Sequence, residues 1–87
     1  MAWQVEYSPA ALKTLRRPDS PIQRRILAFL ETRVTDDPRR AGKAMQGDQR
    51  AWRYRVGDYR LICDIQDASR IVFIVRIGDR KEVYRKR

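Results

Sequence analysis

The sequence of 87 residues contains no histidine and a single cysteine, Cys63. One cysteine excludes an internal disulfide, and the absence of histidine argues against zinc, whose protein sites are built mainly from Cys and His. The first residues show no charged-then-apolar leader pattern, and no apolar run approaches the roughly 20 residues that cross a bilayer. We therefore expect a cytoplasmic protein that uses neither a metal nor another cofactor.

Acidic residues are few beside basic ones: 11 Asp and Glu stand against 20 Lys and Arg, which gives a net charge of +9. Arginine accounts for 16 of the basic residues. Its guanidinium group binds phosphate as a planar fork and stacks on bases, so this bias favours a nucleic-acid partner. With 43% hydrophobic residues, the chain is expected to form one domain, residues 1–87, around a single modest core.

The stretch AWRYRVGDYRLIC, Ala51–Cys63, predicts a β-hairpin. Its first part alternates arginines with apolar residues, as a strand with one buried face does. Gly57-Asp58 is typical of a two-residue hairpin turn. Such a turn pairs Val56 with Tyr59, Arg55 with Arg60, Tyr54 with Leu61 and Arg53 with Ile62.

This pairing separates charged from apolar side chains, because paired residues share a face of the sheet. One face is expected to carry the guanidinium groups of Arg53, Arg55 and Arg60. The opposite face is expected to belong to the core and to carry Trp52, Tyr54, Leu61 and Cys63. Clustered like charges repel one another, so we expect an anionic partner to offset the repulsion.

The N-terminal half predicts one strand and two helices. Trp3–Tyr7 alternates apolar and polar residues, and Ser8-Pro9 is a typical helix start, with the helix running to about Arg17. Ser20 begins a second helix. Its apolar residues recur at helical spacing and are Ile22, Ile26, Phe29, Leu30 and Val34. The short connection predicts antiparallel contact between the two helices.

The second half predicts a loop, the hairpin and a central strand. Thr35–Asp48 has the composition of a loop, and Arg70–Ile77 is apolar apart from its ends and Arg76. A three-residue loop before this strand would place Ile71, Phe73 and Val75 on the apolar face and Arg76 with the other arginines. A two-residue loop would reverse this, and the sequence does not decide between them. Gly78-Asp79 is expected to end the strand, and Lys81–Arg85 to form a last short one.

The expected order is therefore a strand, two helices and three or four antiparallel strands. Both helices can cover the apolar face of the sheet and leave the arginine face open. The sequence thus predicts an α+β fold, with two N-terminal helices packed on one face of a small, mainly antiparallel sheet.

Several segments resemble the RelE/ParE superfamily of toxins from type II toxin–antitoxin systems. They are Ala51–Leu61, Ile77–Arg80 and Glu82–Tyr84, with Lys43 and Gly47 before the hairpin. The gyrase-poisoning ParE branch usually lacks the basic residues and the late tyrosine, whereas Arg60, Arg80 and Tyr84 are present here. The chain therefore looks like a member of the RelE-like branch.

The resemblance implies a function, partners and site residues. RelE-type toxins cut mRNA in the ribosomal A site without a metal, and a cognate antitoxin keeps them silent. The implied catalytic residues are Arg53, Arg55, Arg60, Arg80 and Tyr84. Additional RNA-binding residues are Arg76, Lys81, Arg85, Lys86 and Arg87. The implied partners are mRNA, the ribosome and a partly acidic, RelB-like antitoxin.

Two alternatives stay open. In the first, the chain is a ParE-like or degenerate toxin that acts on another target, such as DNA gyrase, or only binds its antitoxin. In the second, it is a plain basic RNA-binding module. RelE-type toxins also often carry a lysine where Arg53 or Arg55 stands, and arginine effectively cannot lose its proton. The general base is therefore left open among Tyr84, a ribosomal group and water.

Overall fold

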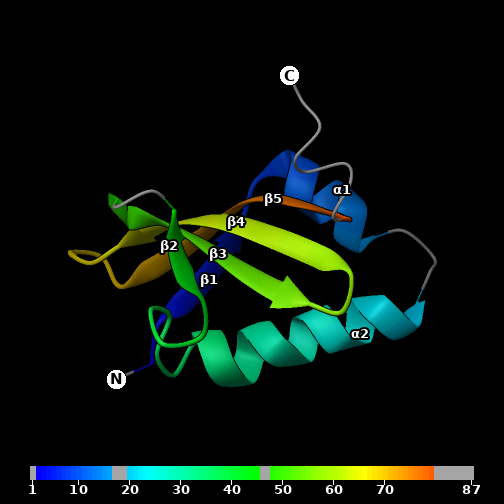
Figure 1. The fold of residues 1–87 in the computed structure, drawn as a ribbon, viewed down its shortest axis with the longest axis horizontal. Helices are drawn as coiled ribbons and strands as arrows, with labels where there is room; N and C mark the ends of the chain where they lie inside the picture. The colour runs from blue at the N-terminus through cyan, green and yellow to red at the C-terminus, as the bar shows by residue number, and fades with distance from the viewer. Residues whose placement is uncertain (1, 17–19, 46–47, 80–87) are drawn as a thin grey trace.

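The structure, a computed structural model, describes residues 2–16, 20–45 and 48–79. Its elements in chain order are β1 (Gln4–Tyr7), α1 (Pro9–Leu15), α2 (Ser20–Phe29), η1 (Leu30–Val34), β2 (Lys43–Met45), β3 (Asp48–Val56), β4 (Tyr59–Gln66) and β5 (Ile71–Asp79) (Figure 1). The strands form one sheet in the order β1-β5-β4-β3-β2. Only the β1–β5 pairing is parallel, so the predicted α+β fold with a mainly antiparallel sheet is confirmed.

Helix α1 begins where the sequence predicts and covers a free edge of β5. Ser8 is its N-cap, and the Ser8 Oγ accepts a hydrogen bond of 3.0 Å from the backbone N–H of Ala11. The same hydroxyl donates to the carbonyl of Val75 over 2.6 Å, just beyond the last β1–β5 pair. Thr14 donates in the same way to the carbonyl of Ile77. These contacts protect an edge that β1 is too short to pair.

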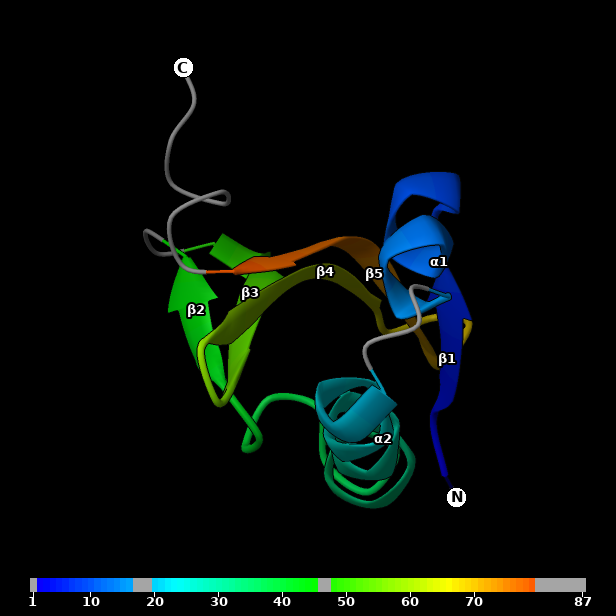
Figure 2. The same cartoon turned by 90° about the vertical axis from the view of Figure 1, so that its right-hand side faces the viewer.

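Helix α2 continues into a π-helical turn, η1, whose wider ladder is seen in the hydrogen bond from the Thr35 N–H to the Leu30 carbonyl. The predicted apolar stripe is confirmed, since Ile26, Leu30 and Val34 are all buried. Figure 2 shows α2 beneath the curved sheet and α1 alongside β5. The expected antiparallel contact between the helices is not their main packing: α1 packs chiefly on β5, and α2 contacts β3.

The core forms between the sheet and the helices, because both helices add residues to one buried cluster. Ala11 of α1 and Ile26 of α2 join the inward-facing Leu61, Cys63 and Ile65 of β4. The cluster also holds a polar anchor. Tyr54 is 1% exposed, its ring meets Phe29 edge-on at 5.6 Å, and its hydroxyl donates to the Pro38 carbonyl over 2.9 Å. Burial raises the pKa of this phenol well above its ordinary value, so it stays a donor.

The β4–β5 connection combines features of both predicted alternatives. Gln66 pairs with Ile71, so the loop has four residues, 67–70, and buries Val72 and Ile74 as a two-residue loop would. Val75 then forms a bulge, where the register shifts between Ile62 and Cys63 of β4. The extra residue switches the faces of the side chains that follow it in β5. Arg76 therefore lies with the arginines, as the three-residue loop would place it.

Two expectations are wrong in their local detail. Lys43–Met45, inside the expected loop, forms β2 and pairs with β3. Gly78 and Asp79, which were expected to break the strand, belong to β5 and pair with Arg60 and Tyr59. A glycine in a strand has no side chain and so leaves space beside its cross-strand partner. Here the partner is Arg60, whose side chain is long. The expected last strand, Lys81–Arg85, lies outside the described residues.

Replacing Tyr54 with Phe should lower the free energy of unfolding by about 1–3 kcal/mol, because the buried Pro38 carbonyl loses its donor while the ring stays in place. Urea denaturation measures this as a lower midpoint with an unchanged slope. Tyr59→Phe is the matched control, since Tyr59 is a partly buried tyrosine of the same hairpin that packs against the same core. Equal midpoints for Tyr54→Phe and the unmodified chain would contradict this account of the core.

Candidate nucleic-acid interface

The β3–β4 hairpin positions the predicted arginines through its register. The four pairs expected from the Gly57-Asp58 turn are all present, and Gly57 has the positive φ of 60° that such a turn requires. Arg53 and Arg55 are exposed and Arg60 is half-buried. The residues between them face the core, where Tyr54, Leu61 and Cys63 are buried and Trp52 packs against the same cluster. The separation of faces is confirmed.

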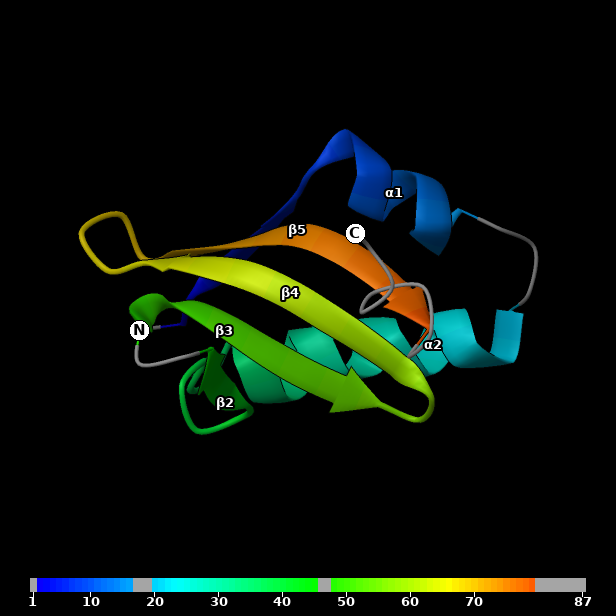
Figure 3. The same cartoon turned by 45° about the horizontal axis from the view of Figure 1, so that its top comes forward.

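The same face extends over the neighbouring strands, which lie side by side in Figure 3. Lys43 of β2 is the partner of Arg53, and Arg76 of β5 is the partner of Ile62. Because cross-strand partners share a face, these cations join the hairpin arginines. We call the set Lys43, Arg53, Arg55, Arg60 and Arg76 the basic face. The basic face thus includes Arg76, which was expected to bind RNA but not to be catalytic. It also includes Lys43, which the sequence did not assign to the site.

A cleft of about 380 Å³ lies beside the basic face, between residues 40–43 and the hairpin strands β3 and β4. Its lining consists of Arg40, Ala41, Gly42, Lys43, Arg53, Tyr54, Arg55 and Arg60. Gly42 is packed so closely on β3 that a Cβ atom there would collide with the Arg53 carbonyl and the Tyr54 ring. The segment that lines the cleft can therefore approach the β3 backbone this closely only because residue 42 is a glycine.

Arg60 carries a polar atom that the described residues leave unsatisfied. Its Nη1 is buried without a hydrogen-bond partner. Arg55 lies directly opposite, so two like charges meet across the β3–β4 ladder, an arrangement that destabilises a sheet. A phosphate bound between the two side chains would reduce this repulsion, because guanidinium and phosphate form paired, charge-assisted hydrogen bonds.

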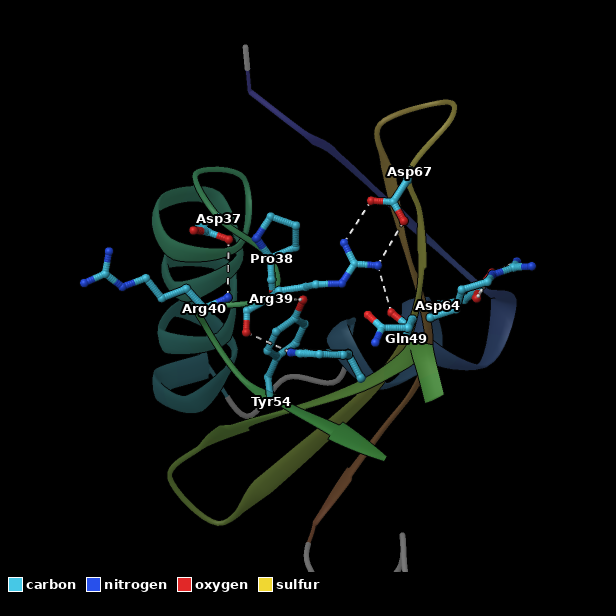
Figure 4. Close-up of polar contacts among 10 residues, drawn as sticks. Asp37, Pro38, Arg39, Arg40, Gln49, Tyr54, Asp64 and Asp67 are labelled. Carbon is cyan, nitrogen blue, oxygen red and sulfur yellow. Dashed lines mark hydrogen bonds and ion pairs between the residues drawn. The ribbon is translucent and has the colours of Figure 1, made fainter. Parts of the chain in front are cut away.

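The segment that forms the cleft is fastened to the core side of the sheet at Arg39 (Figure 4). The Arg39 guanidinium donates to both carboxylate oxygens of Asp67, over 2.8 and 2.9 Å, and to the Gln49 carbonyl over 2.8 Å. It also lies 5.5 Å over the ring of Trp52, whose indole N–H donates to the Arg39 carbonyl. Arg39 thus fixes the chain just before the cleft-lining residues.

Two carboxylates near the sheet are held by arginines that are not part of the basic face. Asp67 is bound by Arg39, and this hydrogen bond lowers the pKa of the carboxyl. Asp64 is bound by Arg50 over 2.7 Å, and its pKa is lowered for the same reason, with a smaller contribution from Gln66. These acids lie toward the β4–β5 loop, away from the hairpin turn. The charges of these two acids are consequently offset by Arg39 and Arg50 and not by the basic face.

Part of the expected site cannot be placed. Arg80, Lys81, Tyr84, Arg85, Lys86 and Arg87 lie outside the described residues. The structure therefore brings together Arg53, Arg55, Arg60 and Arg76, and the roles of all these residues remain predictions. Among the residues that are described, no three His, Cys, Asp or Glu side chains gather as metal ligands would. Over those same ranges, no helix combines the length and apolarity of a membrane span.

The comparison with protein families identifies the class of this chain. Residues 5–84 match the family described as ParE toxin of type II toxin-antitoxin system, parDE. The chain therefore belongs to this toxin family, within the RelE/ParE superfamily that the hairpin motifs predicted. Among curated protein sequences, none matches it significantly.

Solved structures of RelE toxins share the fold. A chain of the RelBE2 toxin–antitoxin complex from Mycobacterium tuberculosis superimposes with a TM-score of 0.81 at 25% identity, covering 92% of this chain and all of that one. The isolated RelE toxin of E. coli gives 0.78 at 26% identity, covering 95% and 92%. The archaeal RelE–RelB complex from Pyrococcus horikoshii gives 0.67 at 26% identity, covering 92% and 97%. The RelE-like fold is thus confirmed.

Replacing Gly42 with Ala should destabilise the protein by more than about 1 kcal/mol, because the methyl group meets β3 backbone that cannot turn aside. Thermal unfolding measures the effect. Ala41→Gly, one residue earlier in the same segment, is the control for a change in chain flexibility. A Gly42→Ala variant as stable as the unmodified chain would show that this segment does not pack on β3 as described.

Acidification should weaken the Arg50–Asp64 pair. A carboxyl whose folded pKa is depressed contributes stability above its unfolded value near 3.8, and this stability is lost as the pH falls through the folded pKa. The pair is partly exposed, so the loss between pH 6 and roughly 3 is limited to about 1 kcal/mol. Urea midpoints for Asp64→Asn should change less over this range than those of the unmodified chain, and identical pH dependence would contradict the assignment. Asp58→Asn, in the exposed turn, is the control.

Proposed function

We propose that this chain is the toxin of a toxin–antitoxin pair and that it cuts mRNA on the ribosome, in the cytoplasm and without a metal ion. Two observations support the proposal: membership of the toxin family over residues 5–84, and a fold shared with RelE toxins at about the same chain length. The observation that carries it is the basic face, where Arg55 and Arg60 are direct cross-strand partners.

The proposed chemistry is attack of a ribose 2′-OH on the adjacent phosphate, which releases the 5′-oxygen of the next nucleotide. The transition state carries more negative charge at phosphorus than the ground state, so fixed donors lower the barrier. Arg53, Arg55 and Arg60 offer such donors from a rigid sheet, and among the described residues the Nη1 of Arg60 has no hydrogen-bond partner. In this scheme the guanidinium groups provide the charge neutralisation that a metal ion provides elsewhere.

Proton transfer needs a group other than these arginines, since arginine effectively cannot act as a base. Arg80 is assigned to the leaving 5′-oxygen and Tyr84 to stacking on a base, with the 2′-OH deprotonated by Tyr84, by the ribosome or by water. In this scheme the chain supplies positive charge around the phosphate, and the ribosome holds the mRNA in the reactive conformation. The reaction therefore requires the ribosome.

The proposed regulator is a cognate antitoxin with an acidic binding segment. The RelBE and RelE–RelB structures show relatives of this chain in complexes with antitoxins. The basic face requires negative charge in whatever covers it, because desolvating five cations without a counter-charge is costly. Association should accordingly be fast at low salt and slower at high salt.

The substitutions Arg60→Ala and Arg80→Ala should each abolish growth arrest when the toxin is expressed without antitoxin. Removing one donor to a developing oxyanion costs about 3–4 kcal/mol, or 10²–10³ in rate. Arg24→Ala, on the exposed face of α2, is the matched control and should remain toxic. The site assignment fails if both the Arg60 and Arg80 variants arrest growth as strongly as the unmodified toxin at equal expression.

The second candidate is a ParE-like action on DNA gyrase, because the matching family model describes ParE toxins. Primer extension on cellular mRNA after induction separates the two. Cuts phased with the reading frame support the ribonuclease. A DNA-damage response without such cuts supports the ParE-like toxin and overturns the proposed cleavage.

A further inference from the structure

The cations of the basic face stand in two rows that cross the sheet. The first row is formed by Arg55 and Arg60, which pair directly. The second row contains Lys43, Arg53, Ile62 and Arg76, in that order across β2, β3, β4 and β5. The rows are two residues apart along each strand, or about 6.6–6.8 Å. Neighbouring phosphates along an extended single strand of RNA are separated by a similar distance.

The second row has the features of a binding site in its own right. Lys43 is exposed and shares a face with Arg53, and both line the 380 Å³ cleft together with Gly42. The lack of a side chain at Gly42 lets the segment that carries Lys43 pack directly against β3 beside Arg53. Ile62 is half-buried between Arg53 and Arg76 and gives the row an apolar contact for a ribose.

We propose that Lys43 and Arg53 bind the phosphate next to the one held by Arg55 and Arg60, so that the basic face grips two consecutive phosphates of one RNA strand. This inference rests on the proposed cleavage of mRNA and adds Lys43 as a substrate-binding residue. The second contact fixes the direction of the strand at the reacting phosphate, since one phosphate alone leaves the strand free to rotate about it.

Binding can be measured without ribosomes or cleavage. The probe is a fluorescent single-stranded RNA with a 2′-deoxy nucleotide at the cleaved position, and its affinity is followed by anisotropy over a range of salt. For single strands the slope of log K against log salt falls by about 0.7 for each phosphate that the protein no longer neutralises. Lys43→Ala should show this decrease, and Lys13→Ala, an exposed lysine of α1, should keep the full slope.

A second probe locates the contact. Each phosphate beside the cleaved position is replaced in turn by a neutral methylphosphonate. One of these two replacements should weaken binding several-fold to the unmodified chain and clearly less to Lys43→Ala, because the variant lacks one of the two side chains that bind this phosphate. The other replacement should have the same small effect on both proteins, because neither row of cations binds that phosphate.

The outcomes separate this inference from the function on which it rests. If Arg60→Ala weakens RNA binding but Lys43→Ala keeps the full salt slope, the second phosphate site is wrong and the first survives. If both methylphosphonates weaken the two proteins equally, Lys43 does not contact a neighbouring phosphate. If Arg60→Ala leaves RNA binding unchanged as well, the basic face does not bind RNA, and the proposed function fails with it.

Discussion

The site depends on the direct opposition of Arg55 and Arg60 across the β3–β4 ladder. Two guanidinium groups in this position repel each other, so the fold must hold them in place by other means. It does so from the opposite face, where Tyr54 and Leu61 are almost fully buried and anchor the same two strands. Burial of these apolar side chains thus stabilises the two strands enough to hold the arginines together despite their repulsion.

The distribution of the remaining charges follows the same arrangement. Arg39 and Arg50 are joined to Asp67 and Asp64 in ion pairs that lie toward the β4–β5 loop. Nearer the hairpin turn, Arg55 and Arg60 stand opposite each other, and among the described residues the Nη1 of Arg60 has no hydrogen-bond partner.

The hairpin and its charged face follow from the sequence because they depend on local rules. A two-residue turn at Gly57-Asp58 fixes the register, and alternation then assigns every side chain to a face. The position of Arg76 could not be derived in this way, because the bulge at Val75 changes the parity of β5 and depends on contacts with α1. The sequence did not place Lys43 on this face of the sheet, because β2 has three residues and no alternation to reveal it. Gly78 predicted the end of a strand, but its pairing with Arg60 keeps it inside β5.

The arginine side chains themselves provide the most direct test, through NMR spectra of their Nε–Hε groups during titration with a short, non-cleavable RNA. If the opposed pair exists to hold a phosphate, the signals of Arg55 and Arg60 shift together and saturate, while those of Arg39 and Arg50, already bound to carboxylates, stay where they are. Uniform, non-saturating shifts of all the arginine signals, or shifts confined to arginines distant from the hairpin, would contradict the account.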